Sequence, residues 1–508
     1  MRVKPKKIPQ KISGNNPDPI DSPVNWPRLF LLIGGFFGLV MLVLTPPFQV
    51  PDEHDHFFRA VMISSGQFVA KSYPFSEELK KKVPKKYLKG KGGIVPVSIP
   101  YTTRNVNHKL PFHPENKQQF SDLKKMLALP LHMKGMPEVF INTSAGGYAP
   151  PLYLPAALTI AVGKSFNLSA LWLMYLGRLA NLMVFLSLIY WTLRITPTGK
   201  PVIFLLALMP MTLFLAPSLS IDGLIIASSI LLTATLMDLA QNDQQPTNYR
   251  DWFIVPITLT ILTLGKVVYC PLILLFFLSP KALFSSDRSR LFLFTSSLVL
   301  AAGCYIIWHW LTNNAGTASV TNIPFDYTSF QAKDQLMPLL NSKKQLQFLQ
   351  HHPSSIFTIL IRTLQDQGLY YIESFIGLLG WLDTKLPFLI YISFPFALIA
   401  SALDSKTLKN HVLTEKVLFA LIWIISTSAI LIGFYLLSTP VSNAIIGGIQ
   451  GRYFIPIALP FLLLFCADYP LPTKTNYYPL SRLNMNWPTI YVVIVLLTTA
   501  STIWCRYY

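Results

Sequence analysis

The residues with the clearest chemical potential form one short cluster, Asp52-Glu53-His54-Asp55-His56, directly after the first apolar run of the chain. Carboxylates and imidazoles are the side chains that most often transfer protons in catalysis. A carboxylate beside the hydrocarbon layer is costly unless it is paired, bound to a metal ion or in a wet cavity. The cluster therefore predicts a functional site at a membrane boundary, while acidic capping of the next helix is the competing interpretation.

Prolines at positions 46, 47 and 51 determine where this cluster lies. They end the preceding helix and stiffen the chain, so we expect Asp52 and Glu53 just outside the first span. A divalent metal ion is the one cofactor that the cluster suggests, with Asp52, Glu53 and His56 as candidate ligands. Adjacent residues rarely converge on one ion, which makes the metal a minor hypothesis.

Composition places the chain among multi-pass membrane proteins. Of its 508 residues, 52% are hydrophobic and only 13% are charged, whereas soluble proteins carry about 25% charged residues. The 42 Lys and Arg residues exceed the 23 Asp and Glu residues, for a net charge of +19. Basic loops that face anionic lipid account for this excess, and no nucleic-acid-binding motif is present. We therefore expect membrane lipids, and no nucleic acid, as partners.

The apolar runs predict an all-α bundle of about 11–13 transmembrane helices. The first span covers residues 29–46, after a disordered basic tail at 1–28 that lacks the features of a cleaved signal peptide. Several later runs are shorter than about 20 residues, so we expect some to be broken, tilted or re-entrant. These runs are 151–163, 168–193, 201–216, 223–240, 252–264, 267–279, 291–312, 386–403, 416–438, 452–468 and 488–506.

Charges in the short loops predict the orientation. Lys and Arg follow the spans that end near positions 193, 279, 403 and 468, which places those loops and the N-terminus in the cytoplasm. The positions of these Lys and Arg residues are consistent with 11 spans if residues 151–163 enter the membrane without crossing it. This orientation gives two external loops. Residues 47–150, with the catalytic-site candidate, precede the membrane bundle 151–312, and residues 313–385, with an interfacial helix, precede the C-terminal membrane helices 386–508.

Three cationic side chains lie in or beside apolar runs. Arg178, ten residues into its run, is too deep to reach the surface easily and should pair with an acid or a phosphate. Lys266, between two short runs, either snorkels or meets an anion. Arg452 lies at the external end of a span among aromatic residues, where it can hold a phosphate or anchor the interface.

Two further motifs place acidic residues next to spans. Residues 218–223 form a predicted hairpin, in which Asp222 is positioned to cap the following helix. Residues 377–387, which contain Asp383, are apolar with a polar end and predict an interfacial helix that enters the next span. We expect a structural role for that helix.

Six motifs that occur in order carry a resemblance to a known family. They are Pro51-Asp52-Glu53 with His56 and Arg59-Ala60, Tyr148-Ala149-Pro150-Pro151-Leu152-Tyr153, Arg178-Leu179, Ser218-Leu219-Ser220-Ile221-Asp222, Leu379-Gly380-Trp381-Leu382-Asp383 and Gln450-Gly451-Arg452-Tyr453. Together they resemble a bacterial family of predicted polytopic membrane proteins of unknown function. That family is grouped with the GT-C membrane glycosyltransferases, and the resemblance covers the chain from about Leu29 to the last span.

The resemblance implies roles for particular residues. GT-C enzymes use a polyprenyl-phosphate sugar donor and a carboxylate in the first external loop, so Asp52 or Glu53 would be catalytic. The charged residues 54–56 depart from the better characterised transferases and leave open which carboxylate acts. The donor phosphate or lipid would contact Arg59, Arg178, Lys266 and Arg452, and the other pocket candidates are His56, Tyr153, Asp222, Asp383, Gln450 and Tyr453.

The expected function is therefore an inverting GT-C-type glycosyltransferase in the bacterial cytoplasmic membrane. It would move a sugar from a polyprenyl-phosphate carrier to an envelope glycan or lipid acceptor on the external face. Cations near the interface would hold the phosphate while a carboxylate acts as general base. The chain has no P-loop, GxSxG or HExxH motif, which argues against ATP-driven transport and against serine or zinc hydrolysis. A non-catalytic transporter or flippase of a lipid-linked saccharide is the alternative, since buried membrane charge is expected there too.

Overall fold

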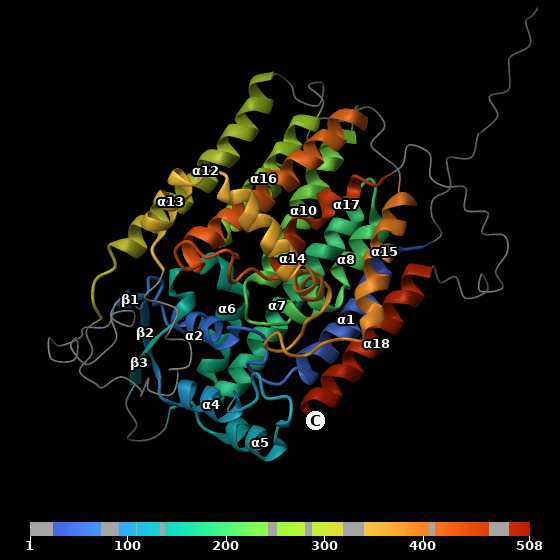
Figure 1. Ribbon diagram of the computed structural model, residues 1–508. Helices are drawn as coiled ribbons and strands as arrows, with labels where there is room; N and C mark the ends of the chain where they lie inside the picture. The colour runs from blue at the N-terminus through green and yellow to red at the C-terminus, as the bar shows by residue number, and fades with distance from the viewer. Residues whose placement is uncertain are drawn as a thin grey trace, which may run out of the picture.

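The computed structural model describes residues 24–72, 91–107, 109–132, 138–241, 251–279, 287–318, 340–405, 412–466 and 487–508. In these ranges the chain is mostly helical, with one small sheet (Figure 1). The prediction of an all-α multi-pass membrane protein is confirmed. Most of the basic tail and of the loops that predict the orientation lie outside the described residues, so the orientation stays a prediction.

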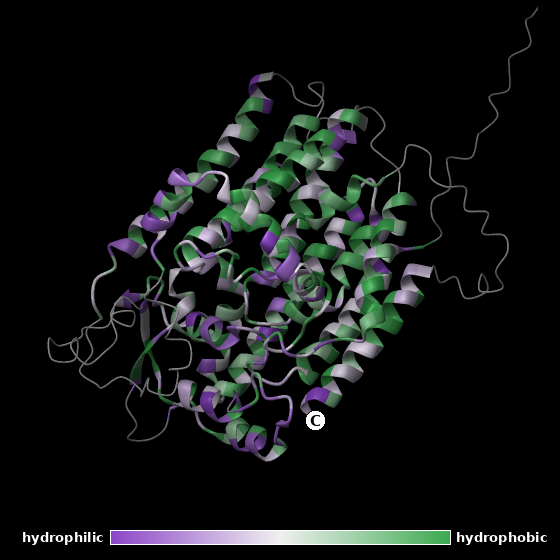
Figure 2. Cartoon of the chain, in the orientation of Figure 1, coloured by the Kyte–Doolittle hydropathy of each residue, from purple (hydrophilic) through white to green (hydrophobic). Residues whose placement is uncertain are grey.

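Within the described part of the chain, six helices are long and apolar enough to cross a membrane. The most enclosed is α10, because 89% of its most apolar window is buried, against at most 44% for the other five. It therefore lies at the centre of the bundle, whereas the other five helices, which are also largely apolar (green in Figure 2), are less buried. The six are α1 (Trp26–Leu44), α7 (Ala170–Ile195), α10 (Asp222–Gln241), α12 (Asp287–Asn313), α16 (Val412–Ser438) and α18 (Trp487–Tyr507).

The bounds of α1 follow from its flanking residues. Asn25 caps the helix by accepting a hydrogen bond from the Arg28 amide at 3.2 Å. The helix ends before two consecutive prolines, which cannot donate to its last carbonyls. The first span is therefore Trp26–Leu44, slightly earlier than the predicted 29–46.

The other predicted spans are shorter or interrupted helices. α6 has 12 residues, about 18 Å, and is too short to cross a hydrocarbon core of about 30 Å by itself. Interrupted backbone at membrane depth is tolerated only where protein buries it or where it lines a cavity. These elements are α6 (Leu154–Ser165), α8 (Lys200–Ala207), α9 (Pro210–Leu215), α11 (Asp251–Gly265), η4 (Val267–Leu278), α15 (Phe388–Leu403), η8 (Gly451–Ile457) and α17 (Ala458–Leu463).

The first loop folds into a small lobe at one end of the bundle, at the lower left of Figure 1. Its sheet has the strand order β1-β2-β3 with antiparallel pairing, and Ile94 lies opposite Phe140. A Cβ atom on Gly92 would lie 1.8 Å from the Ile141 carbonyl oxygen, so only glycine allows this pairing. The elements are α2 (Glu53–Ser64), β1 (Lys71–Ser72), β2 (Lys91–Pro96), α4 (Ser98–Asn107), α5 (Phe120–Ala128), β3 (Glu138–Asn142), η2 (Ser144–Gly147) and η3 (Pro150–Tyr153).

The second predicted loop contains α13 (Ser342–His351) and α14 (Ser355–Ile376). The prediction of an interfacial helix at residues 377–387 is wrong, because those residues form a turn that is closed by an antiparallel β-bridge between Leu379 and Thr384. Gly380 and Leu382 have φ values of 61° and 63°, which a right-handed helix does not accommodate. The helix of this region is α14, which ends just before the turn.

Candidate functional site

A cavity of about 410 Å³ lies where segments far apart in the sequence meet. The starts of α2, α10 and η8, the junction between α11 and η4, and the second half of α16 all contribute to it. Six residues predicted for the site line the cavity: Asp52, His56, Asp222, Lys266, Arg452 and Tyr453.

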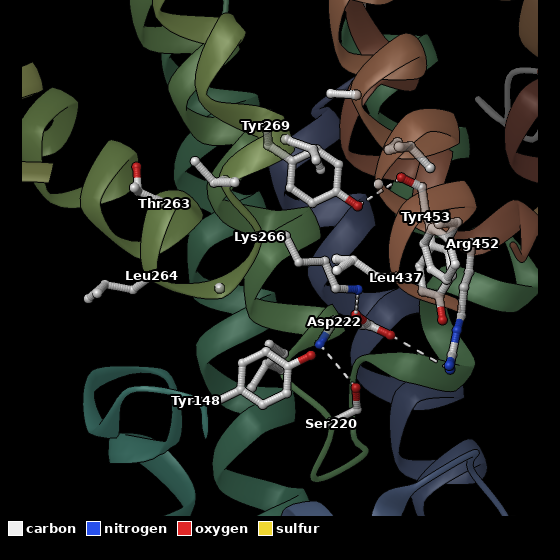
Figure 3. A pocket seen from close by; sticks show the side chains of 18 of the residues that line it. Tyr148, Ser220, Asp222, Thr263, Leu264, Lys266, Tyr269, Leu437, Arg452 and Tyr453 are labelled. Carbon is white, nitrogen blue, oxygen red and sulfur yellow. Dashed lines mark hydrogen bonds and ion pairs between the residues drawn. The ribbon is translucent and has the colours of Figure 1, made fainter. Parts of the chain in front are cut away.

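Asp222 and two cations form the centre of the cavity (Figure 3). Lys266 Nζ donates a hydrogen bond to Asp222 Oδ1 at 2.6 Å. Arg452 Nη1 lies 3.6 Å from Asp222 Oδ2, which is close enough for an ion pair but too long for a hydrogen bond. The Asp222 amide donates to Ser220 Oγ at 3.2 Å, so Ser220 caps this helix start and the carboxylate faces the cations instead.

Tyr453 holds both cations in place. Its ring centroid lies 4.5 Å from Lys266 Nζ and 5.5 Å from Arg452 Cζ, which are cation–π distances. Tyr269 Oη donates to the Tyr453 carbonyl at 2.8 Å and so fixes the backbone at this point. The two positive charges therefore have a common aromatic support beside the cavity.

Arg452 is 6% exposed, yet its Nε and Nη1 atoms have no hydrogen-bond partner among the described residues. A buried donor without a partner costs about 1–3 kcal/mol, and more when the group is charged. Such a group is therefore a candidate for ligand binding. Because the guanidinium is a planar donor of several hydrogen bonds, a phosphate or carboxylate oxygen is the complementary ligand.

Gly451 determines where Arg452 lies. Its amide donates to Ser374 Oγ at 2.7 Å, which joins the start of η8 to α14. A Cβ atom on Gly451 would lie 1.9 Å from the Tyr371 carbonyl oxygen. No other residue fits this close approach of two backbones, so the glycine of the motif is a packing requirement.

Asp52 occupies a left-handed backbone conformation, with φ 60° and ψ 10°, immediately before α2. Non-glycine residues rarely adopt this conformation, although Asp and Asn tolerate it better than most, and such strain is often found at functional sites. The carboxylate does not cap α2 and makes no hydrogen bond or ion pair with another described residue. Asp52 is therefore the acid at the cavity that is free to act on a ligand.

His56 lies one turn further along α2. Its Nδ1 is 2.6 Å from Tyr153 Oη, and its ring stacks on Tyr148 with centroids 5.9 Å apart. Burial lowers the pKa of His56 below its usual 6.5, so the imidazole is neutral at pH 7. Nε2 has no hydrogen-bond partner among the described residues and remains available at the cavity.

Glu53 does not line the cavity. Its side chain is fully buried, and Arg178 binds it with two hydrogen bonds, from Nε at 2.8 Å and from Nη2 at 2.5 Å. The Leu219 amide donates to the same carboxylate at 3.2 Å. Arg178 also donates to carbonyls at the end of α1, at Leu42, Thr45 and Pro46. The pair therefore ties α1, α2, α7 and the turn before α10 together, and Glu53 is a positioning residue.

Arg59 also lies away from the cavity. Its guanidinium is fully buried and donates to the carbonyls of Gln67, Phe68 and Tyr148. Burial lowers the pKa of Arg59 to about 10, so the side chain is still charged at neutral pH. It holds the segment that carries Tyr148 against α2, and no described contact links it to the cavity cations.

Asp383 belongs to a separate cluster at the C-terminal helix. It accepts from the Phe112 amide at 3.0 Å and pairs with Arg506 at 3.2 Å. The neighbouring Trp381 donates through Nε1 to the Phe48 carbonyl at 3.0 Å. The turn therefore joins the first loop to α18, and Asp383, which was predicted as a pocket residue, does not line the cavity.

Three tyrosines of the cavity, Tyr148, Tyr269 and Tyr305, were not among the predicted site residues. Tyr148 lies in a recognised motif, but nothing in the sequence indicates that its ring packs on His56. Tyr269 is the one hydroxyl-bearing ring in an otherwise apolar run, which was a usable signal. Among the described residues, no group of three His, Cys, Asp or Glu side chains lies close enough to hold a metal ion.

Comparison with known proteins identifies one family. A model of the family described as "Predicted membrane protein (DUF2142)" matches residues 35–461, which is most of the chain. No curated protein and no solved structure matches the chain. The matched range contains all the residues that line the cavity.

Proposed function

We propose that this chain, which belongs to the DUF2142 family of predicted membrane proteins, is a glycosyltransferase that uses a lipid-linked phosphosugar. The donor is a polyprenyl-phosphate sugar, and the acceptor is an envelope glycan or lipid at the outer face of the bacterial cytoplasmic membrane. The observation that carries the proposal is the buried, incompletely bonded Arg452 beside Lys266 in a cavity that also holds the free carboxylate of Asp52.

The lining of the cavity suits a donor of this kind. A lipid-linked donor combines a phosphate, a sugar and an apolar chain, and the cavity offers a different surface for each. Arg452 and Lys266 supply positive charge for the phosphate. Ile430, Phe434 and Leu437 of α16 supply apolar surface on a helix long enough to span the bilayer.

The proposed reaction needs a base and a stabilised leaving group. The acceptor hydroxyl oxygen attacks the anomeric carbon of the sugar, and the bond from that carbon to the phosphate oxygen breaks. The proton of the hydroxyl passes to the Asp52 carboxylate, and the carrier phosphate leaves with the electron pair of the broken bond. Arg452 and Lys266 stabilise the charge that develops on this phosphate. Asp222 is already bonded to Lys266, so we assign the role of base to Asp52.

The test compares two acids of the same cluster. Asp52→Asn removes the proposed base. Asp55→Asn changes an acid that accepts a hydrogen bond from Ser144 Oγ at 2.5 Å and does not line the cavity. Each purified variant is incubated in detergent with a polyprenyl-phosphate sugar, and the release of free polyprenyl phosphate is measured. Loss of a general base should slow release by about 100- to 10,000-fold in the Asp52 variant and leave the Asp55 variant near the wild type.

Two outcomes would reject the proposal. Wild-type turnover in the Asp52→Asn variant would exclude this residue as the base. Movement of the intact donor across a vesicle membrane by the wild type, with no free carrier phosphate, would identify a transporter instead.

A further inference from the structure

A second pocket, of about 270 Å³, lies between α14 and the loop that precedes η8. Gln367 and Tyr370 line it from α14, and Asn443, Gly448 and Gln450 line it from the loop. Its volume is slightly below the roughly 300 Å³ at which pockets for drug-sized ligands begin, so it suits a ligand of about one ring.

The lining of this pocket combines the amide side chains of Gln367, Asn443 and Gln450 with apolar surface from three isoleucines, and it carries no charged side chain. Side-chain amides both donate and accept hydrogen bonds, which matches hydroxyl groups that do the same. Gln450 Oε1 is buried and has no hydrogen-bond partner among the described residues. The Tyr370 ring adds a flat apolar surface, which suits the C–H face of a sugar ring. A neutral polyol fits this combination better than a phosphate or an acyl chain.

Hydrogen bonds hold the loop against its neighbours, so the pocket is formed without a ligand. The Ile446 amide donates to Thr363 Oγ1 of α14 at 3.0 Å. The Ser442 amide donates to Gln345 Oε1 of α13 at 2.9 Å. Gly448 has φ +82°, a conformation that glycine adopts readily. A preformed pocket loses less conformational freedom when it binds its ligand.

The second pocket adjoins the cavity of the candidate site. Gln450 lines the second pocket, and Arg452, two residues later, lines the cavity. The ring of Phe434, which lines the cavity, stacks on Tyr453 with centroids 5.2 Å apart. The same ring lies 3.4 Å from the position of a Cβ atom on Gly448, which lines the second pocket. The two spaces therefore share a wall made of Phe434 and residues 450–453.

We infer that the second pocket binds one sugar ring of a saccharide acceptor, with Gln450 as its principal hydrogen-bonding residue. The role as acceptor site rests on the proposed function, whereas saccharide binding does not. The inference selects a glycan over a lipid as the acceptor class. Gln450 is then a specificity residue, and Asp52 remains the base.

The first experiment measures binding alone. Methyl glycosides of glucose, galactose, rhamnose and N-acetylglucosamine are offered at millimolar concentration to the purified protein, and bound glycoside is detected by saturation-transfer NMR. We expect at least one glycoside to bind the wild type and to bind Gln450→Ala about tenfold more weakly, since one hydrogen bond to a ligand is lost. Gln367→Ala, which changes the pocket from α14, should weaken binding as well. Gln365→Ala, an exposed residue of α14 outside the pocket, is the matched control and should bind as the wild type does.

The second experiment separates the inference from the proposed function. Gln450→Ala should raise the KM for the bound glycoside about tenfold in the transfer assay, whereas the control Gln365→Ala should keep the wild-type KM. Glycoside binding without any release of carrier phosphate would leave the subsite standing and remove the proposed function. Failure of all four glycosides to bind the wild type, or equal binding by the wild type and Gln450→Ala, would overturn the inference.

Discussion

Replacing Glu53 by glutamine removes one charge from a fully buried ion pair and leaves the Arg178 guanidinium without its counter-ion. The remaining acceptors of Arg178 are three neutral backbone carbonyls at the end of α1. Breaking a buried pair by removing one partner costs about 3–5 kcal/mol. The amide nitrogen of the new glutamine would also face a donor, so part of the paired geometry is lost. We expect the free energy of unfolding of Glu53→Gln to fall by that amount.

The assay is equilibrium unfolding in mixed micelles, with Asp52→Asn as the matched neighbour. The Asp52 carboxylate makes no bond to another described residue, so its change should alter the free energy of unfolding by less than about 1 kcal/mol. The double variant Glu53→Gln with Arg178→Met should lose less stability than the sum of the two single variants, because the pair is one unit. Equal effects of the Asp52 and Glu53 changes, or strict additivity in the double variant, would contradict the structural role of Glu53.

Two further predictions concern Gly451 and His56. Gly451→Ala places a Cβ atom 1.9 Å from the Tyr371 carbonyl oxygen, so we expect a large loss of folded protein on size-exclusion chromatography. Gly433→Ala is the control, because a Cβ atom there would meet no other atom within 4 Å, and this variant should elute as the wild type does. Burial lowers the pKa of His56 below 6.5, so His56 binds a proton more readily in the unfolded state than in the folded state. The neutral His56 therefore contributes fully to the free energy of unfolding above pH 6.5, and this contribution should decrease as the pH falls below 6.5. Melting temperatures between pH 7.5 and 5 should show a smaller decrease in His56→Gln than in the wild type, and equal slopes would assign the decrease to other groups.

For Arg178 and Lys266, the sequence predicted part of what the structure shows. A cation deep in an apolar run must find an anion, because water is absent there, and that argument predicted a partner for Arg178. The partner is Glu53, 125 positions earlier in the chain. Lys266 had two open interpretations, and the structure shows it bonded to Asp222. Sequence reasoning identified that these charges need partners but did not assign the pairs.

The sequence left open which of the two acids after the first helix, Asp52 or Glu53, is catalytic. Asp52 and Glu53 are adjacent and chemically alike, so composition and spacing treat them equally. In the structure the start of α2 turns the two side chains to different surroundings, one toward the cavity and one toward Arg178. The choice depends on the left-handed conformation of Asp52, which no local pattern indicated.

The turn at residues 377–387 was misread for a related reason. Its apolar character is typical of an interfacial helix, but the residues are apolar because they pack in the interior: Leu379 is fully buried. Burial inside a protein and burial in a lipid interface select the same residue types. Only the arrangement of neighbouring elements distinguishes them.

The linear order of the residues determined that this chain is a membrane protein built of helices, since apolar runs of sufficient length have no other stable state in lipid. It also determined which polar residues are exceptional, because a charge next to hydrocarbon is costly wherever it occurs. Tertiary structure alone decided which of those residues meet. Asp52, Asp222, Lys266 and Arg452 are separated by up to 400 positions, and their common cavity exists because interrupted helices must bring their free ends together in the protein interior.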